Sequence, residues 1–214
     1  MQAELFAESG PRPARQLAAG ASLLPGHALE HESQIWQMLQ AILQQAPLRR
    51  MQTPGGHTMS VSMSNCGTLG WVSGAGGYRY CTLDPANGQP WPAMPPALAM
   101  LARQWAAVAG FDGFDSNACL INCYEPGSKM SLHQDRDERD FSHPIVTLSL
   151  GLPARFQLGG LQRSDSCQRI PLFHGDVLVF GGPSRLCFHG IMPLAAGTHP
   201  LLGSRRISLT LRRA

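Results

Sequence analysis

The sequence has 214 residues, the length of one domain, and 43% of them are hydrophobic, which is enough to form a buried core. Only 14% are charged and the net charge is +3, so anionic partners are permitted but not required. The six cysteines are scattered without a CxxC pair, which argues against a disulfide framework and a structural zinc site, and no apolar run approaches the length of a membrane span.

The N-terminal part of the chain is predicted to be irregular before a first helix. Residues 1–6 lack the basic and apolar regions of a signal peptide, so we expect a cytoplasmic protein with no membrane partner. Glycine and proline interrupt residues 1–26, which predicts an irregular arm with room for one strand. Apolar residues then recur on one helical face over 28–45, and Pro47 ends that helix.

The next segments alternate between strand, turn and helix patterns. Residues 59–63 alternate like a strand, and residues 71–81 combine three glycines with two tyrosines, which is typical of a hairpin with loops. The proline-rich residues 84–96 exclude regular structure. A second helix is predicted over 97–109, where Gly110 ends it.

From residue 117 the pattern changes to short strands separated by Gly, Pro, Asp and Ser. Repeated strands without intervening helices favour an antiparallel sandwich or jelly roll over a parallel sheet. The predicted strands cover residues 118–124, 144–151, 154–158, 168–173, 176–180, 184–189 and 205–212.

The pair His133 and Asp135 is the first candidate for chemistry. Residues two apart on an extended backbone face the same way, so both side chains can reach one metal ion. His189, on the predicted strand 184–189, is the best candidate for a third ligand. Two histidines and one carboxylate with open positions are typical of non-haem Fe(II) oxygenases. For the pair taken alone, a hydrogen-bonded turn is the more ordinary explanation.

The C-terminal strand alternates polar and apolar residues. Arg206, Ser208, Thr210 and Arg212 share one face, and a solvated polar face is the usual explanation of such a pattern. If this face points into a barrel, its two arginines need anionic partners, which a dicarboxylate would supply.

A further strand, residues 118–124, precedes the histidine–aspartate pair. Asn122 and Tyr124 share one of its faces and could hydrogen-bond the same ligand. A core strand with incidental polar residues explains the spacing equally well.

Taken together, the motifs resemble those of the AlkB family of Fe(II)/2-oxoglutarate-dependent dioxygenases, which are direct-reversal DNA repair enzymes. The resemblance extends over nearly the whole chain and is weakest in the first forty residues. It is carried by Pro54-Gly55-Gly56, Asn65-Cys66-Gly67, Pro90-Trp91-Pro92-Ala93-Met94-Pro95, Leu132-His133-Gln134-Asp135, Ser149-Leu150-Gly151-Leu152-Pro153, His174-Gly175-Asp176-Val177 and Gly181-Gly182.

The resemblance implies a mainly β fold with flanking helices. Residues 1–214 would form a single domain, in which 1–115 supply an extension, helices and a nucleotide-recognition lid, and 116–214 form a double-stranded β-helix (jelly-roll) core. His133, Asp135 and His189 would bind Fe(II). The residues implied to hold 2-oxoglutarate are Asn122, Tyr124, Arg206, Ser208 and Arg212; Ser208 stands where the family usually has Asn, and Phe180 where Trp is usual.

For the substrate, the resemblance points to Trp71 and Tyr78 in the lid and to Asp137 and Arg163. Trp71 would stack on a flipped methylated base with His133 on the other side, and Tyr78 would bind the nucleic-acid backbone. Asp137 would accept a hydrogen bond from the base or balance its positive charge. Without the resemblance, packed aromatics and solvated surface charges are the ordinary explanations of these residues.

The implied activity is oxidative demethylation of 1-methyladenine and 3-methylcytosine in single-stranded DNA, and in RNA, by a monomer. The enzyme would use Fe(II), 2-oxoglutarate and O2 and release formaldehyde, succinate and CO2. An oxygenase acting on a protein or a small molecule, and an inactive nucleic-acid-binding relative, are the alternatives.

Overall fold

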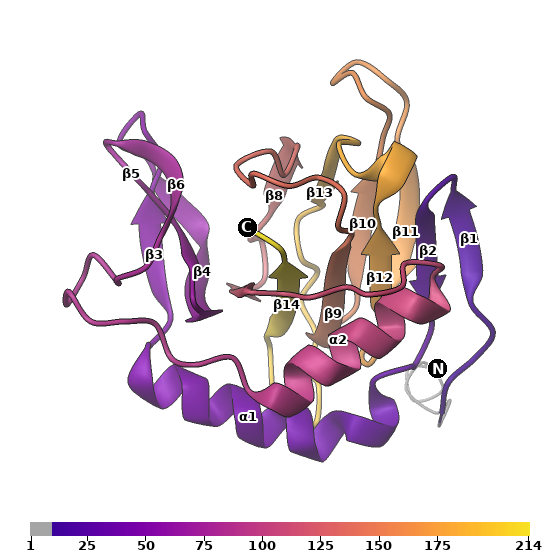
Figure 1. The fold of residues 1–214 in the computed structure, drawn as a ribbon, viewed down its shortest axis with the longest axis horizontal. Helices are drawn as coiled ribbons and strands as arrows, with labels where there is room; N and C mark the ends of the chain where they lie inside the picture. Colours follow the sequence, from indigo (N-terminus) through magenta and orange to yellow (C-terminus); the bar gives the residue numbers. More distant parts are fainter. Residues whose placement is uncertain (1–9) are drawn as a thin grey trace.

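The computed structural model describes residues 10–214, so the prediction that residues 1–6 form no signal peptide lies outside the described part. Helices and strands alternate in the first half, and strands dominate the second (Figure 1). In chain order the elements are β1 (Arg15–Ala18), β2 (Ala21–Leu24), the 3-10 turn η2 (Leu29–His31), α1 (Glu32–Gln45), β3 (Arg49–Gln52), β4 (Thr58–Gly67), β5 (Gly70–Gly74), β6 (Gly77–Cys81), α2 (Pro96–Val108), β7 (Ala118–Tyr124), β8 (Met130–His133), β9 (Ile145–Gly151), β10 (Ala154–Leu158), β11 (Gln168–Leu172), β12 (Val177–Phe180), the 3-10 turn η3 (Gly182–Ser184), β13 (His189–Ile191) and β14 (Arg206–Arg212).

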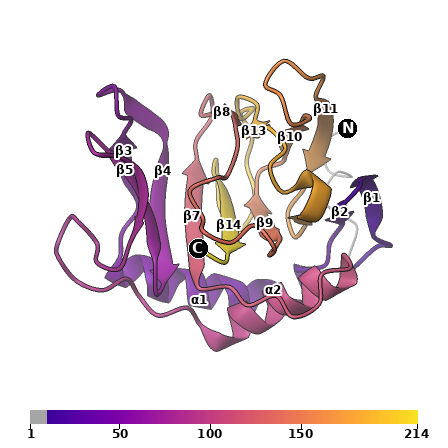
Figure 2. The ribbon, with the colours of Figure 1, turned by 45° about the horizontal axis from the view of Figure 1, so that its top comes forward.

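Two antiparallel sheets form the body of the protein. The larger has the strand order β1-β2-β12-β9-β14-β7-β4-β3, and the smaller has the order β11-β10-β13-β8. β5 and β6 pair only with each other and form a hairpin, which stands with β3 and β4 at one side of the molecule (Figure 2). The predicted mainly β, jelly-roll fold is confirmed, and strands from the first half of the chain extend the larger sheet at both edges.

The larger sheet separates two apolar cores. On its outer face, Ile35, Leu39 and Ile42 of α1 occupy one helical stripe and pack with residues of α2, β7, β9 and β14. The helices lie side by side along this face in both views (Figures 1 and 2). The inner face packs toward the smaller sheet, with Phe156 and Phe180 among its members. Within residues 10–214 no helix is long and apolar enough to span a membrane.

The strand β14 lies inside the larger sheet, between β7 and β9, and this position determines where its polar and apolar faces point. Ile207, Leu209 and Leu211 join the outer core. The polar face, which begins with Arg206 and ends with Arg212, is also buried, so the solvated-face explanation is wrong. A sheet covered on both faces gives these polar side chains no access to bulk water, and they must find partners inside the protein or in a ligand.

Several predicted boundaries differ from the structure. The strand predicted over 184–189 is wrong: a 3-10 turn occupies Gly182–Ser184, and the strand starts only at His189. The described part of the N-terminal arm contains a hairpin of two strands, β1 and β2, where one strand was expected. Sequence periodicity also missed β3 and β8, because four residues are too few to display a pattern.

A histidine pair packs where the β11–β12 turn meets α1. His174 Nδ1 accepts a hydrogen bond from the backbone N–H of Gly151 at 2.9 Å, and its Nε2 lies 3.0 Å from Glu32. The His199 ring stacks on it at 4.4 Å. Burial lowers the pKa of His174 despite the opposing effect of Glu32, and burial with the neighbouring His174 lowers that of His199.

This pair predicts a loss of stability in mild acid. When folding lowers the pKa of a histidine, its contribution to the free energy of unfolding is complete at pH values above the unfolded-state pKa. That contribution is lost as the pH falls through the lowered, folded-state pKa. We expect His174→Gln, which cannot titrate but can still accept from Gly151, to lose less unfolding free energy than wild type between about pH 7.5 and about pH 5.5 in urea titrations. The control is His57→Gln on the exposed β3–β4 turn, and equal acid losses in all three proteins would contradict the prediction.

Candidate metal centre and pocket

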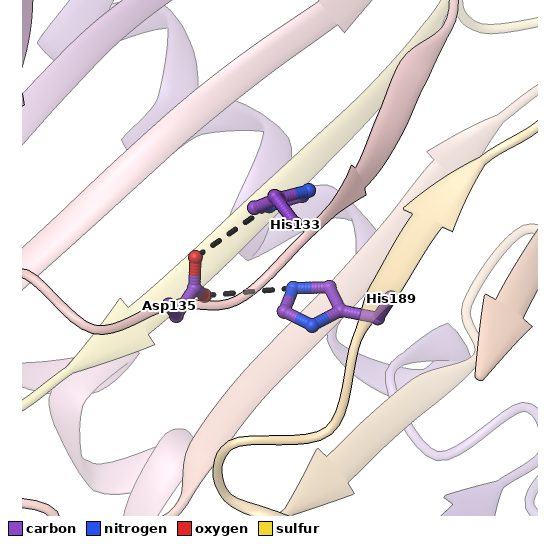
Figure 3. A group of neighbouring side chains, drawn as sticks. All are labelled: His133, Asp135 and His189. Atoms are coloured by element: carbon purple, nitrogen blue, oxygen red, sulfur yellow. Dashed lines mark ion pairs between the residues drawn. The ribbon is translucent and has the colours of Figure 1, made fainter. Parts of the chain in front are cut away.

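His133, Asp135 and His189 meet because of strand pairing. β8 pairs with β13, and in this register His133 lies directly opposite His189. The two ring centroids are 4.4 Å apart, and one potential ligand atom from each of the three residues lies within 4.8 Å of the others. Asp135 follows β8 and turns its carboxylate between the imidazoles, with His133 Nε2 at 3.6 Å and His189 Nε2 at 3.7 Å (Figure 3).

The backbone fixes the tautomer of each imidazole. His133 Nδ1 lies 2.8 Å from the carbonyl of Ser131, and His189 Nδ1 lies 3.0 Å from the carbonyl of Cys187. A carbonyl oxygen only accepts, so each Nδ1 carries the proton and each Nε2 keeps its lone pair. Both lone pairs therefore face the carboxylate, as metal ligands require.

Charge and burial favour the metal-binding forms of Asp135 and His189. Burial opposes the ionisation of Asp135, but the adjacent Arg212 and the two histidines outweigh it and hold the carboxyl pKa far below its ordinary value. Burial, with the neighbouring His133, lowers the pKa of His189 to about 4. A carboxylate with two neutral imidazoles fits a divalent ion of the borderline class, and this donor set is the one that Fe(II) oxygenases use.

The triad opens into a cavity of about 570 Å³ that contains an unpaired cation. Arg206 is 1% exposed; its Nε donates to Ser149 at 3.1 Å and its guanidinium lies 5.0 Å from the ring of Tyr124. Within the described residues, Arg206 Nη1 and Asn122 Oδ1 are buried without a hydrogen-bond partner. A buried guanidinium with a free N–H is costly unless an anion binds it. The cavity therefore fits a negatively charged ligand that reaches from the triad to Arg206.

Arg212 differs from Arg206 at the other end of the same strand face. Its Nη2 donates to Asp135 Oδ2 at 2.5 Å, so its anionic partner belongs to the protein. Arg212 therefore does not need an external anion, whereas Arg206 has no carboxylate partner among the described residues. The contacts of both arginines with 2-oxoglutarate stay predictions. Ser208 lies between them, opposite Asn122 in the β7–β14 register, and both line the cavity.

The four residues predicted to bind substrate lie around the same cavity. Trp71 and Tyr78 stack on each other with centroids 5.4 Å apart, and Trp71 Nε1 donates to Asp137 Oδ2 at 2.8 Å. Tyr78 is 48% exposed, so a large part of its ring faces solvent. Arg163 donates to the carbonyl of Leu132 at 2.6 Å and lies over the ring of Phe188 at 4.9 Å. The four residues thus share one cavity, while the stacked rings of Trp71 and Tyr78 and the exposure of Asp137 and Arg163 also agree with packed aromatics and surface charges, so their substrate roles stay predictions.

Sequence reasoning missed three residues behind the triad, namely Tyr80, Glu138 and Arg185. Glu138 belongs to the run Asp135-Arg136-Asp137-Glu138-Arg139-Asp140, which has the composition of a solvated loop. In the structure its side chain is 2% exposed and Arg185 lies 3.2 Å away. Nothing in the local sequence distinguishes this buried acid from its exposed neighbours.

The chain is similar to known oxygenases along most of its length. Residues 20–212 match the family model described as the 2OG-Fe(II) oxygenase superfamily. The Alpha-ketoglutarate-dependent dioxygenase AlkB of Salmonella typhimurium and that of Escherichia coli are each 51% identical over 211 residues, which cover 99% of this chain and 97% of each relative. The Nucleic acid dioxygenase ALKBH1 of Homo sapiens is 38% identical over 97 residues, covering 45% of this chain and 25% of that protein.

A solved structure also resembles this fold closely. The structure of OsALKBH1 superimposes with a TM-score of 0.83 and 26% sequence identity, covering 94% of this chain and 100% of the other. A full-length jelly-roll match of this kind agrees with the strand order described above.

If the triad holds a divalent metal, His133→Ala should abolish tight binding without unfolding the protein, because the His133 side chain is 37% exposed. Loss of a direct ligand should weaken Co(II) affinity by more than about 100-fold, since removing a group that only supports a ligand costs about 10-fold to 100-fold. The measurement is a Co(II) titration followed by visible absorption. His57→Ala, which removes an exposed imidazole outside the cavity, should bind like wild type, and a His133→Ala titration that matches it would contradict the assignment.

Proposed function

The chain belongs to the 2OG-Fe(II) oxygenase superfamily and, within it, to the AlkB dioxygenases, and from this premise we propose that it demethylates N-alkylated bases in nucleic acid. It is an alpha-ketoglutarate-dependent dioxygenase that uses Fe(II), 2-oxoglutarate and O2. The proposed lesions are 1-methyladenine and 3-methylcytosine in single-stranded DNA and RNA. We propose that the enzyme acts as a monomer in the cytoplasm, with residues 1–115 supplying the lid and 116–214 the catalytic core.

One observation carries the proposal: a metal-binding triad, an unpaired buried guanidinium and a pair of stacked aromatic rings all border one cavity. The triad and the guanidinium together fit a diacid cosubstrate, which must bind the metal at one end and a cation at the other. The aromatic pair fits a flat ring.

At the metal end of the cavity, three residues would bind the metal and a fourth would orient its carboxylate ligand. His133, Asp135 and His189 would bind Fe(II), which together with 2-oxoglutarate and O2 supplies the oxidising power to hydroxylate the methyl group, so that it leaves as formaldehyde with succinate and CO2 as coproducts. Arg212 occupies one oxygen of the Asp135 carboxylate and so leaves the other for the metal.

The cosubstrate would lie along the polar face of β7 and β14. Arg206 would bind the distal carboxylate through its free Nη1, which gains an anionic partner and removes the cost of the buried unpaired N–H. Asn122 would donate its amide to the same ligand, and Tyr124 and Ser208 line the wall beside it. Ser208 is shorter than the Asn usual in the family and would leave that position to a water molecule or a longer contact.

The base would enter beneath the hairpin. Trp71 would stack on its ring, and Tyr78 and Arg163 would bind phosphates at the rim of the cavity. Asp137 is held in place by the Trp71 indole, and its carboxylate would balance the positive charge that a methylated ring nitrogen carries. The same methyl group blocks Watson–Crick pairing, which lowers the cost of turning the base out of a strand.

The direct test is turnover of a 1-methyladenine oligonucleotide by enzyme reconstituted anaerobically with Fe(II) and then exposed to O2, with and without 2-oxoglutarate. We expect formaldehyde and succinate in equal amounts, and neither without 2-oxoglutarate. Succinate without formaldehyde from any methylated oligonucleotide would indicate a protein or small-molecule substrate. No succinate under any condition would contradict the oxygenase activity itself.

Trp71→Ala should weaken binding of the methylated oligonucleotide by about 1–3 kcal/mol, the energy of one base–aromatic stack. Trp71→Phe is the matched variant: it keeps a stacking ring but removes the N–H that holds Asp137, so it should lose less. Fluorescence anisotropy with Mn(II) and 2-oxoglutarate present measures both affinities without turnover. Wild-type affinity in Trp71→Ala would rule out the stacking role.

A further inference from the structure

Glu138 is a buried carboxylate that joins the hairpin to the metal end of the cavity. It lies in the loop between β8 and β9, three residues after Asp135, and its side chain is 2% exposed. Its Oε1 accepts a 2.6 Å hydrogen bond from the Tyr80 hydroxyl on β6. Two guanidiniums flank it, with Arg185 Nη2 at 3.2 Å and Arg212 Nε at 3.4 Å.

Arg185 clamps the backbone of the loop that carries the carboxylate ligand. Its Nη1 donates to the carbonyl of Asp135 at 2.7 Å, and its Nε donates to the carbonyl of His143 at 3.1 Å. The guanidinium also lies 5.2 Å from the ring of Phe141. A side chain that is 3% exposed and bonded at both ends of the segment 135–143 restrains where Asp135 lies.

Tyr80 links Glu138 to Arg212 through its hydroxyl group. Its hydroxyl donates to Glu138 and accepts from Arg212 Nη1 at 3.3 Å, while Arg212 Nη2 holds Asp135. Burial raises the pKa of Tyr80 although Arg212 opposes the shift, so the phenol keeps the proton that it donates. A hairpin residue is therefore two hydrogen bonds away from the carboxylate of the triad.

We propose that Tyr80, Glu138 and Arg185 are positioning residues that couple closure of the β5–β6 hairpin over the base to the orientation of the metal ligand Asp135. The proposal rests on the proposed function for the identity of the metal ligand. With the hairpin closed, the Tyr80 hydroxyl and the Glu138 carboxylate hold Arg212 against Asp135. Displacement of the hairpin removes one of these restraints and frees the Arg212 guanidinium to turn.

The charges of the cluster give Glu138 a second effect. Asp135 and Glu138 are balanced by Arg185 and Arg212, so the two cations are shared between two carboxylates. If Glu138 loses its charge, both guanidiniums act on Asp135 alone. A carboxylate that faces more positive charge attracts a metal cation less, so the metal affinity should fall.

Tyr80→Phe tests the link to the hairpin by removing one hydroxyl from an intact ring. Amide hydrogen exchange over residues 70–81 should become about threefold to tenfold faster, the effect of one lost hydrogen bond on local opening. Turnover should become uncoupled, with succinate exceeding formaldehyde, while Mn(II) affinity changes little. Unchanged exchange and equal products would overturn the coupling.

Glu138→Gln tests the link to the metal, and Asp115→Asn is its matched control. Asp115 is also an acid between two arginines, Arg103 at 3.6 Å and Arg213 at 2.9 Å, but on the exposed surface. Mn(II) binding, followed by the electron paramagnetic resonance signal of free Mn(II), should weaken about 10-fold in Glu138→Gln and remain as in wild type in Asp115→Asn. Equal affinity in all three proteins would overturn the role of Glu138.

The variants also separate this proposal from the proposed function. If Glu138→Gln does not fold, the variants Tyr80→Phe and Arg185→Lys remain. Arg185→Lys keeps the charge but cannot bridge both carbonyls, so it should uncouple turnover as Tyr80→Phe does. Coupled turnover in both variants would overturn the proposal.

If wild type forms no formaldehyde from methylated oligonucleotides, the proposed base substrate is wrong. Hairpin exchange in Tyr80→Phe and Mn(II) affinity in Glu138→Gln still decide the coupling in that case.

Discussion

The register between β8 and β13 is the constraint on which the site depends. It sets His133 opposite His189 although fifty-five residues separate them in the chain, and Asp135 reaches the same point because it follows β8 by two residues. A shift of one residue would turn either imidazole to the opposite face of the small sheet and leave two ligands at most. Ser131 and Cys187 reinforce the arrangement, since their carbonyls fix both Nε2 lone pairs toward Asp135.

Around this register the protein distributes buried charge unequally. Arg212 is neutralised by Asp135 and Glu138 within the chain, whereas Arg206 has a free Nη1 at the far end of the cavity. Arg212 thereby restrains the Asp135 carboxylate, whereas Arg206 Nη1 has no partner among the described residues and a bound anion would supply one. Two arginines six residues apart on one strand thus have different surroundings, because the loop 134–144 supplies acids to one end of the strand and not to the other.

Much of this was predictable from the sequence, and the limits have physical causes. The spacing of His133 and Asp135 indicated a metal site with His189 as the candidate third ligand. The resemblance supported that ligand and added an inward polar face of β14, whereas the alternation of β14 alone favoured a solvated face. The Glu138 cluster was not predictable: its members come from β6, the loop after β8, the turn after η3 and β14, and only tertiary packing brings them together. In the segment predicted as the strand 184–189, Arg185 lies in a turn and donates to the carbonyls of Asp135 and His143, contacts that the local sequence does not reveal.

The central claim is that one ion is held by His133, Asp135 and His189 while a diacid extends from it to Arg206. A crystal structure of the protein with Mn(II) and 2-oxoglutarate, grown without O2, measures this directly. The account predicts an anomalous manganese peak between the two Nε2 atoms and the Asp135 carboxylate, and a cosubstrate carboxylate within hydrogen-bond distance of Arg206 Nη1. Manganese bound elsewhere, or a cosubstrate that leaves Arg206 unpaired, would contradict it.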